Sequence, residues 1–139
     1  MVKKNTCVFI SGYGSNLRSL INYSRNQNFP VNISLVICNN INAKGIFYAK
    51  KNSIPYLIIN TKKRDFENNI LKKIKKHRIS LICLAGYMKI ISKKFIQNFG
   101  KKIINIHPSL LPKFKGMNTF NRILKKREKK TGSTVHYVN

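Results

Sequence analysis

The chain has 139 residues, of which 28 are Lys or Arg and only 3 are Asp or Glu, so its formal net charge is +25. This length fits one domain with a core of its own, and no apolar run approaches the length that spans a bilayer. Cys7, Cys38 and Cys83 lie far apart inside apolar runs, without the spacing of a zinc site. We therefore expect a single domain over residues 1–139, cytoplasmic, with buried and reduced thiols.

The positive charge has two explanations. Dense Lys and Arg neutralise phosphates in proteins that bind nucleic acids. The Lys pairs of this chain, however, are spread over its whole length, whereas a binding stripe would cluster them on one element with aromatic residues between them. We favour compositional drift toward Lys, Ile and Asn. We expect no specific nucleic-acid partner, only loose binding that weakens with salt.

Short apolar runs alternate with longer segments of mixed polarity along the chain. The expected strands are residues 7–11, 33–38, 56–59, 81–85, 102–107 and 133–138. The expected helices are residues 16–24, 43–52, 65–77, 92–99 and 119–130. Alternating strands and helices predict an α/β fold, a Rossmann-like open and mostly parallel sheet with helices on both faces. In such sheets ligands bind beyond the carboxyl ends of the strands.

The first strand leads into a glycine-rich turn, residues 11–17 (SGYGSNL). Its glycines permit a tight turn, and Ser15 or Asn16 can cap the next helix, whose first N–H groups then face an anion. Leu17 stands where a dinucleotide fingerprint has its third glycine, and the Gly-Lys-Ser/Thr of a phosphate-binding P-loop is missing. Either an ordinary strand-to-helix turn or a phosphate site explains this segment, and the latter is only slightly favoured.

The fourth strand ends in residues 84–91 (LAGYMKII). Gly86 permits close approach of the backbone, and Tyr87 with Met88 offers a flat apolar wall for a planar ring. A core strand that runs into the next helix explains the same residues equally well.

The fifth strand carries two polar residues near its end. Strand alternation places Asn105 and His107 on one face and Ile104 and Ile106 on the other. An amide donor beside an imidazole suits the stabilisation of an oxyanion and the delivery of a proton in acyl transfer. No nucleophile stands next to this pair, and the histidines of the chain lack metal-ligand spacing. Direct transfer between two bound substrates, without a metal, therefore fits best.

Five segments together resemble the phosphoribosylglycinamide formyltransferase family, in the family's order and spacing. They are residues 11–17, 84–88, 105–112 (NIHPSLLP), 114–116 (FKG) and 132–137 (GSTVHY). The resemblance implies a Rossmann-like formyltransferase domain. It also implies direct transfer of the formyl group of 10-formyltetrahydrofolate to the amine of glycinamide ribonucleotide in purine (IMP) biosynthesis.

The resemblance also implies a role for each matching residue. The phosphate of the ribonucleotide would be held by Gly14, Ser15 and Asn16. The folate would be bound by Arg64, Met88, Lys89, Ile90, Ile91 and Asn105. Asn105 and His107 would stabilise the tetrahedral intermediate, with His107 as the proton donor. The partners are then two small molecules, and a homodimer is compatible with the sequence.

The family continues past the strand at 133–138 into a loop whose Asp pairs with the catalytic His, whereas this sequence ends at Asn139. Asp65, Glu67 and Glu128 are the only carboxylate side chains, and all three are expected at exposed helix positions far from His107. A neighbouring carboxylate would favour the charged imidazole. We therefore expect a shortened copy with reduced or no activity; the alternative to an active enzyme is a relic that keeps only ligand or partner binding.

Overall fold

The computed structural model describes residues 2–107, 115, 122, 125–126 and 133–139, with His107 described by its backbone alone. The strands are β1 (Lys4–Ile10), β2 (Val31–Cys38), β3 (Tyr56–Ile58), β4 (Leu81–Leu84), β5 (Lys102–His107) and β6 (Thr134–Tyr137). The helices are α1 (Ser15–Ser24), α2 (Ile46–Lys51), α3 (Phe66–Lys76) and α4 (Lys93–Phe99). These elements confirm the expected ones, and most of the helix expected at 119–130 lies outside the described residues.

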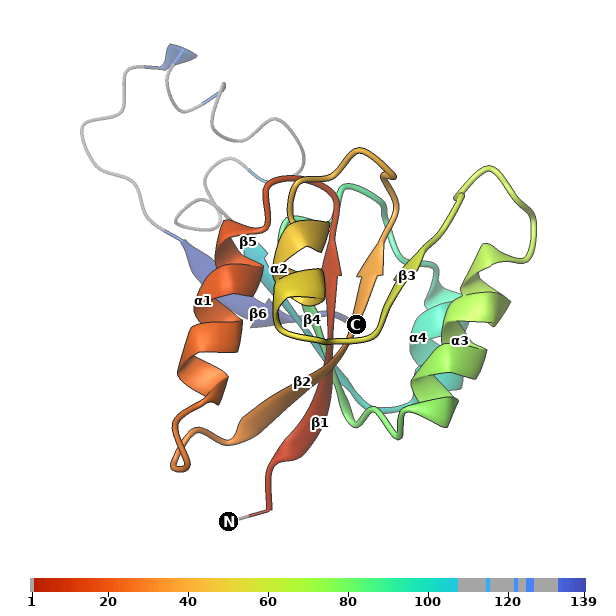
Figure 1. The fold of residues 1–139 in the computed structure, drawn as a ribbon. Helices are drawn as coiled ribbons and strands as arrows, with labels where there is room; N and C mark the ends of the chain where they lie inside the picture. The colour runs from red at the N-terminus through yellow and green to blue at the C-terminus, as the bar shows by residue number, and fades with distance from the viewer. Residues whose placement is uncertain (1, 108–114, 116–121, 123–124, 127–132) are drawn as a thin grey trace.

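The strands form one sheet in the order β3-β2-β1-β4-β5-β6 (Figure 1). Neighbouring strands from β3 to β5 are parallel, and β6 is antiparallel to β5. The predicted mostly parallel α/β sheet is therefore confirmed. The chain adds β2 and β3 on one side of β1 and then β4 and β5 on the other, so the strand order reverses between β1 and β4. At such a switch point the loops after two neighbouring strands part and leave a crevice.

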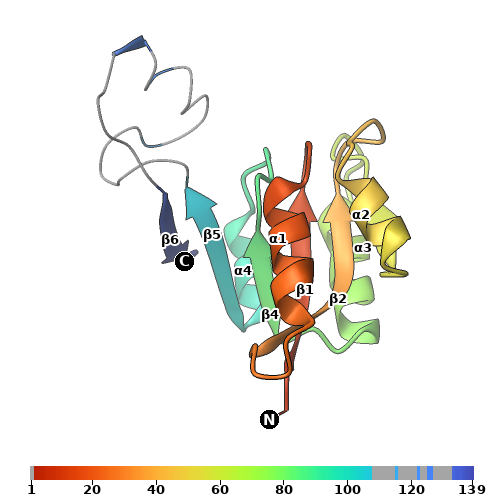
Figure 2. The same cartoon turned by 60° about the vertical axis from the view of Figure 1, so that its left-hand side comes forward.

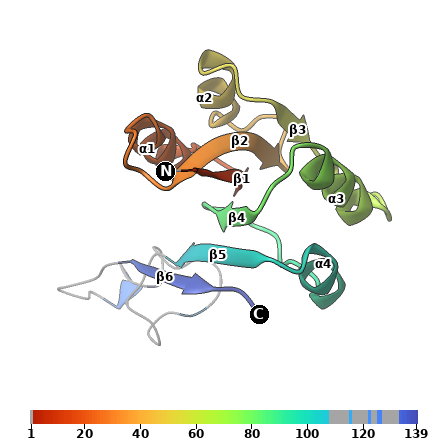
Figure 3. The same ribbon diagram turned by 90° about the horizontal axis from the view of Figure 1, so that it is seen from below.

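The helices cover both faces of the sheet (Figure 3). Leu17 and Ile21 of α1 pack with Ile46 and Ala49 of α2 in one apolar cluster, on what we call the α1–α2 face. The second cluster, on the α3–α4 face, contains core residues of the other two helices and of the sheet. They are Ile70, Ile74, Phe95, Phe99, Phe9, Leu84 and Ile103. Each buried strand is thus apolar on both sides, as the continuous apolar runs predicted.

The pairing of β6 with β5 brings two distant parts of the sequence together at one edge of the sheet (Figure 2). Asn105 lies opposite His136, and His107 lies opposite Thr134. On β5, Ile104 and Ile106 pack toward the α1–α2 face, while Ile103 belongs to the other cluster. Because side chains alternate along a strand, Asn105 lies on the α3–α4 face. Among the helices described, none is long and apolar enough to cross a membrane.

All three cysteines are free and buried, which confirms that prediction. Burial raises the pKa of the Cys83 thiol from 9.0 to about 11, and it also raises that of Cys7 well above its ordinary value. The native state therefore holds the Cys83 proton more tightly than the unfolded state. The stability that this proton contributes is complete below the unfolded pKa and is lost as the pH rises through the folded pKa.

We therefore expect the free energy of unfolding of wild type to fall relative to that of a Cys83→Val variant as the pH rises. The fall should occur between the pKa of the Cys83 thiol in the unfolded protein and its pKa in the folded protein. Val has a similar volume and no proton to lose, and the titration of all other groups cancels in the comparison. Urea unfolding of both proteins at about pH 8 and about pH 10.5 measures the effect. An unchanged difference between the two proteins would contradict the raised pKa.

Candidate functional site

Ser11 joins three loops at the carboxyl edge of the sheet. Its hydroxyl accepts a hydrogen bond from the Met88 N–H at 2.8 Å and donates one to Asn39 Oδ1 at 2.6 Å. The Ser11 carbonyl accepts a third from Asn40 Nδ2 at 3.3 Å. The turns that follow β1, β2 and β4 are therefore held in one arrangement around the switch point. The only sequence signal for this role of Ser11 is a hydroxyl side chain directly after a central strand.

The turn after β1 depends on Gly14. Its φ of +77° is left-handed, and its carbonyl accepts the first helical hydrogen bond, from the Arg18 N–H at 2.8 Å. A Cβ on Gly14 would lie 2.6 Å from the Cα of Gly45, at the start of α2. The glycine therefore allows both the turn and the close approach of two backbones.

The expectation that Ser15 or Asn16 caps α1 is wrong. Gly14 itself is the N-cap residue, and no side chain makes a cap hydrogen bond there. Side-chain capping uses an extended residue just before the first helical turn, and here that position is a left-handed glycine. Ser15 and Asn16 stand instead in the first turn of the helix, exposed to solvent.

The loop after β4 presents apolar side chains in two directions. Tyr87 turns inward, where its ring meets the ring of Phe9 edge-on with centroids 5.2 Å apart, and burial raises its pKa to about 12. Met88 and Ile90 are 59% and 86% exposed, and Ile91 packs against the core. Lys89 is exposed between them. Of the two residues expected to form an outward apolar wall, Met88 is exposed and Tyr87 is not, and Ile90 is a further exposed apolar residue of this loop.

Glu67 contradicts the expectation that all three carboxylate side chains are exposed. It is half-buried, and its carboxylate accepts hydrogen bonds from the Ser92 hydroxyl at 2.5 Å and from the Ser92 N–H at 3.1 Å. Ser92 in turn caps α4. Asp65 is exposed but precedes α3, and Arg64 is exposed in the turn before it. Glu67 therefore joins the start of α3 to the end of the β4 loop, on the side of the molecule where Arg64 lies.

We expect Glu67→Ala to lower the free energy of unfolding by about 1–2 kcal/mol, because it removes two hydrogen bonds to a charged acceptor. Asp65→Ala is the matched control, since it removes the same charge from an exposed side chain that makes no cap hydrogen bond. The control should change stability by less than about 0.5 kcal/mol. Urea unfolding distinguishes the two variants, and equal losses would assign the effect to net charge alone.

Asn105 makes its contact with His136, a residue to which the sequence alone gives no role in the site. Asn105 Nδ2 lies 3.2 Å from His136 Nε2, and His136 Nδ1 lies 3.0 Å from the Tyr137 carbonyl oxygen. An amide nitrogen can only donate and a carbonyl can only accept, so Nε2 accepts and the proton is on Nδ1. One neutral tautomer satisfies both contacts. The second N–H of the Asn105 amide then has no hydrogen-bond partner among the described residues.

His107 ends β5, two residues beyond Asn105, and its backbone pairs with Thr134. The alternation of the strand assigns both residues to one face. The described carboxylates are Asp65 and Glu67, and neither is hydrogen-bonded to Asn105 or His136; Glu128 lies outside the described residues. Of the segments that carry the resemblance, residues 108–112, 114, 116 and 132 also lie outside them.

This arrangement places a glycine-rich turn, an apolar loop and an amide–imidazole pair around the carboxyl ends of β1, β4 and β5. Residues 4–139 match the family model described as formyl transferase. The chain belongs to the formyl transferase family.

Proteins named phosphoribosylglycinamide formyltransferase are among its relatives. The enzyme of that name from Haemophilus influenzae is 40% identical over 98% of this chain and 66% of its own length. The one from Bacillus subtilis is 38% identical over 98% of this chain and 72% of its own length. The crystal structure of phosphoribosylglycinamide formyltransferase from Anaplasma phagocytophilum superposes with a TM-score of 0.89 at 41% identity. The match takes in 99% of this chain and 65% of that protein. The chain therefore spans about two thirds of the length of these three relatives.

Proposed function

We propose that this formyl transferase moves the formyl group of 10-formyltetrahydrofolate to the amine of glycinamide ribonucleotide, a step of purine biosynthesis. The observation that carries the proposal is the Asn105 amide, fixed by His136 at the carboxyl end of β5, in a chain of this family. An amide that is already oriented by one N–H has the other available for an oxygen on which negative charge develops.

The turn after β1 would hold the phosphate of the nucleotide. Gly14 brings the backbone into position, and the first-turn N–H groups of α1 have no capping side chain. The exposed hydroxyl of Ser15 and amide of Asn16 add two donors. Helix N-termini of this kind bind phosphate through backbone donors and the helix dipole.

The loop after β4 would hold the folate. The exposed Met88 and Ile90 offer apolar contact area for the pterin, with Lys89 and Ile91 beside them. Arg64, exposed before α3, would meet the negative charge of the folate tail. The two polyanionic substrates would therefore enter the crevice at the switch point from two sides.

Transfer would proceed directly between the two bound molecules. The amine of the ribonucleotide attacks the formyl carbon, and the carbon–nitrogen bond to the folate breaks after a tetrahedral stage. Asn105 donates to the formyl oxygen, and His107 delivers the proton that the leaving nitrogen needs. The attacking amine loses one proton as the new amide forms, and that proton restores the donor. The amine is itself the nucleophile, so we propose a reaction without a metal. The free thiols of Cys7, Cys38 and Cys83 support a reducing compartment, which we propose is the cytoplasm.

A second candidate is a domain that binds these ligands with little or no turnover. The positions of the two described carboxylates favour this candidate. Glu67 accepts hydrogen bonds from Ser92, and Asp65 lies at the start of α3. Neither carboxylate is hydrogen-bonded to Asn105 or His136. Neither would therefore favour a charged imidazole at the carboxyl end of β5.

Formyl transfer by the purified protein, with glycinamide ribonucleotide and 10-formyltetrahydrofolate, tests both candidates. We expect turnover that His107→Ala lowers by about 10²–10⁴-fold, as expected for the loss of a general acid. Turnover unaffected by this substitution would contradict the assigned chemistry. Binding of both substrates without turnover in wild type would favour the second candidate over the first.

A further inference from the structure

The turn after β1 and the loop after β4 part at the switch point of the sheet, and a single side chain bridges them there. The last backbone hydrogen bond between these two segments of the chain runs from the Ala85 N–H to the Phe9 carbonyl oxygen, at 2.9 Å. Two residues beyond Phe9, the Ser11 hydroxyl accepts a hydrogen bond from the Met88 N–H at 2.8 Å. Among the described residues, no other hydrogen bond joins the turn to the loop.

The orientation of the Ser11 hydroxyl is fixed by its two partners. A hydroxyl has one proton to donate and two lone pairs that accept. Asn39 Oδ1, at 2.6 Å, can only accept, so the proton points to Asn39 and the lone pairs remain for the Met88 N–H. The turn after β2 therefore orients the hydroxyl that holds the loop after β4.

The loop after β4 is held at its far end as well. The hydroxyl and the N–H of Ser92 donate to the Glu67 carboxylate at 2.5 and 3.1 Å. Between the two attachments lie the exposed apolar side chains of Met88 and Ile90. Replacing Ser11 by Ala removes the attachment next to Met88 and leaves only the one at Ser92. The position of these apolar side chains therefore depends on the Ser11 hydroxyl.

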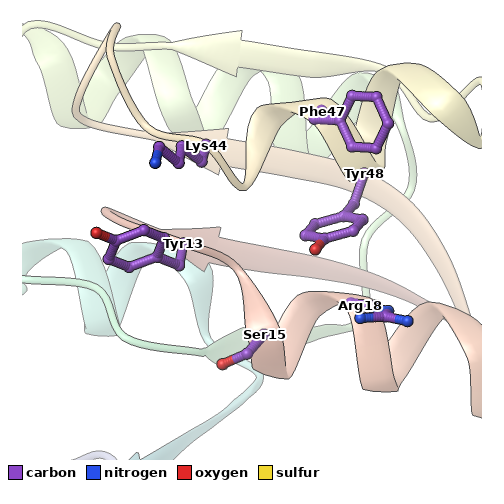
Figure 4. A pocket seen from close by; sticks show the side chains of 6 residues that line it. All are labelled: Tyr13, Ser15, Arg18, Lys44, Phe47 and Tyr48. Carbon is purple, nitrogen blue, oxygen red and sulfur yellow. The ribbon is translucent and has the colours of Figure 1, made fainter.

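The turn after β1 is held on its other side by the start of α2. The Gly45 N–H donates to the Gly12 carbonyl oxygen at 2.9 Å. The Lys44 ammonium lies 5.2 Å from the centre of the Tyr13 ring (Figure 4). Because the turn is attached on both sides, a ligand that orders it also restricts Ser11 and, through Ser11, the loop after β4. When one ligand has already ordered a segment, a second ligand that needs the same order binds at a lower entropic cost.

We propose that Ser11 is a positioning residue that couples the two substrate sites of the proposed reaction. A phosphate bound at the turn after β1 holds Ser11 in place, and Ser11 holds the backbone of Met88, so that the apolar side chains of the loop stand in the arrangement that the pterin requires. Each substrate then raises the affinity of the other by the same factor, because coupling between two binding sites is reciprocal. The inference rests on the proposed function and adds to it a residue that acts through the backbone of Met88.

Calorimetric titration of the purified protein with tetrahydrofolate, with and without saturating glycinamide ribonucleotide, tests this proposal. Tetrahydrofolate carries no formyl group, so the complex with both ligands cannot react. In wild type the nucleotide should raise the affinity for tetrahydrofolate by about fivefold or more. In Ser11→Ala this increase should fall below about twofold, whereas Ser11→Thr, which keeps the hydroxyl, should retain it.

Ser34→Ala is the matched control. Ser34 is also half-buried, and its hydroxyl also donates to an asparagine, Asn5 Oδ1 at 3.3 Å, near the amino ends of β1 and β2. This variant should show the same coupling as wild type. Coupling that survives in Ser11→Ala, or that is lost equally in Ser34→Ala or Ser11→Thr, would overturn the role of Ser11. Urea unfolding shows that each variant is folded under the conditions of the titration.

A second measurement uses wild type alone. The Met88 N–H should exchange with solvent more slowly once the nucleotide is bound, which amide hydrogen exchange followed by nuclear magnetic resonance detects. An exchange rate that the nucleotide leaves unchanged would overturn the inference. Binding of both ligands without coupling in wild type would overturn this inference alone, whereas binding of neither ligand would overturn the proposed function itself.

Discussion

Replacing Asn105 by Ala is expected to lower kcat for formyl transfer by about 10²–10³-fold, the range measured when one oxyanion donor is removed from an enzyme. The amide is held by His136 with one N–H directed elsewhere, so its loss removes a donor that is already in place. Because that donor acts most strongly as charge develops, kcat should fall far more than the KM for either substrate rises.

Asn32→Ala is the matched control for that experiment. Asn32 is an exposed amide on β2 that donates to the hydroxyl of Ser34 at 3.3 Å, away from the crevice. It should retain wild-type kcat, and urea unfolding should show that both variants remain folded. Undiminished kcat in Asn105→Ala would remove this amide from the mechanism, while a rise in KM alone would reassign it to substrate binding.

Replacing Gly14 by Ala is expected to lower the free energy of unfolding by roughly 3 kcal/mol. A left-handed φ alone costs a non-glycine residue about 1–2 kcal/mol. The added Cβ would also lie 2.6 Å from the backbone of Gly45, so α2 or the turn must shift. Since the same turn is the proposed phosphate site, affinity for glycinamide ribonucleotide should fall as well.

Two other glycines separate the causes of this loss. Gly86 has the same φ of +77°, but a Cβ there would meet nothing within 4 Å, so Gly86→Ala measures the backbone strain alone. Gly12 has neither problem, and Gly12→Ala should be close to neutral. Urea unfolding of the three variants should rank them Gly14, Gly86, Gly12 in decreasing loss of stability. If Gly14→Ala lost no more than Gly86→Ala, the contact between the two turns would have no energetic consequence.

The strands could be predicted because their signal is local. Residues 33–38 and 81–85 are unbroken apolar runs, which a strand buried on both faces requires and an exposed helix does not. The assignment of Asn105 and Ile104 to opposite faces follows from the two-residue period of a strand. The apolar clusters place Ile103 on one face and Ile104 and Ile106 on the other, as this period requires. The order of the strands is not contained in these runs, because the rules for connections reduce the possible orders to a few without choosing one.

The errors concern contacts between segments that are distant in the sequence. Glu67 looked like a solvated helix residue because its partner, Ser92, is 25 positions away. Ser11 and Met88 are 77 positions apart, and Asn105 and His136 are 31 apart. The capping role expected of Ser15 failed because the position of Gly14 is decided by its approach to Gly45, which no local pattern contains.

The sequence by itself determined the elements, the fold class and the motifs that mark the family, because these depend on local periodicity and on residue types at fixed spacing. Only the tertiary structure decided that His136 orients the Asn105 amide, that Ser11 joins three loops, and that the Lys44 ammonium lies over the Tyr13 ring. Hydrogen bonds and ring contacts require groups to meet within a few ångströms, and the folding of the sheet alone brings these groups together.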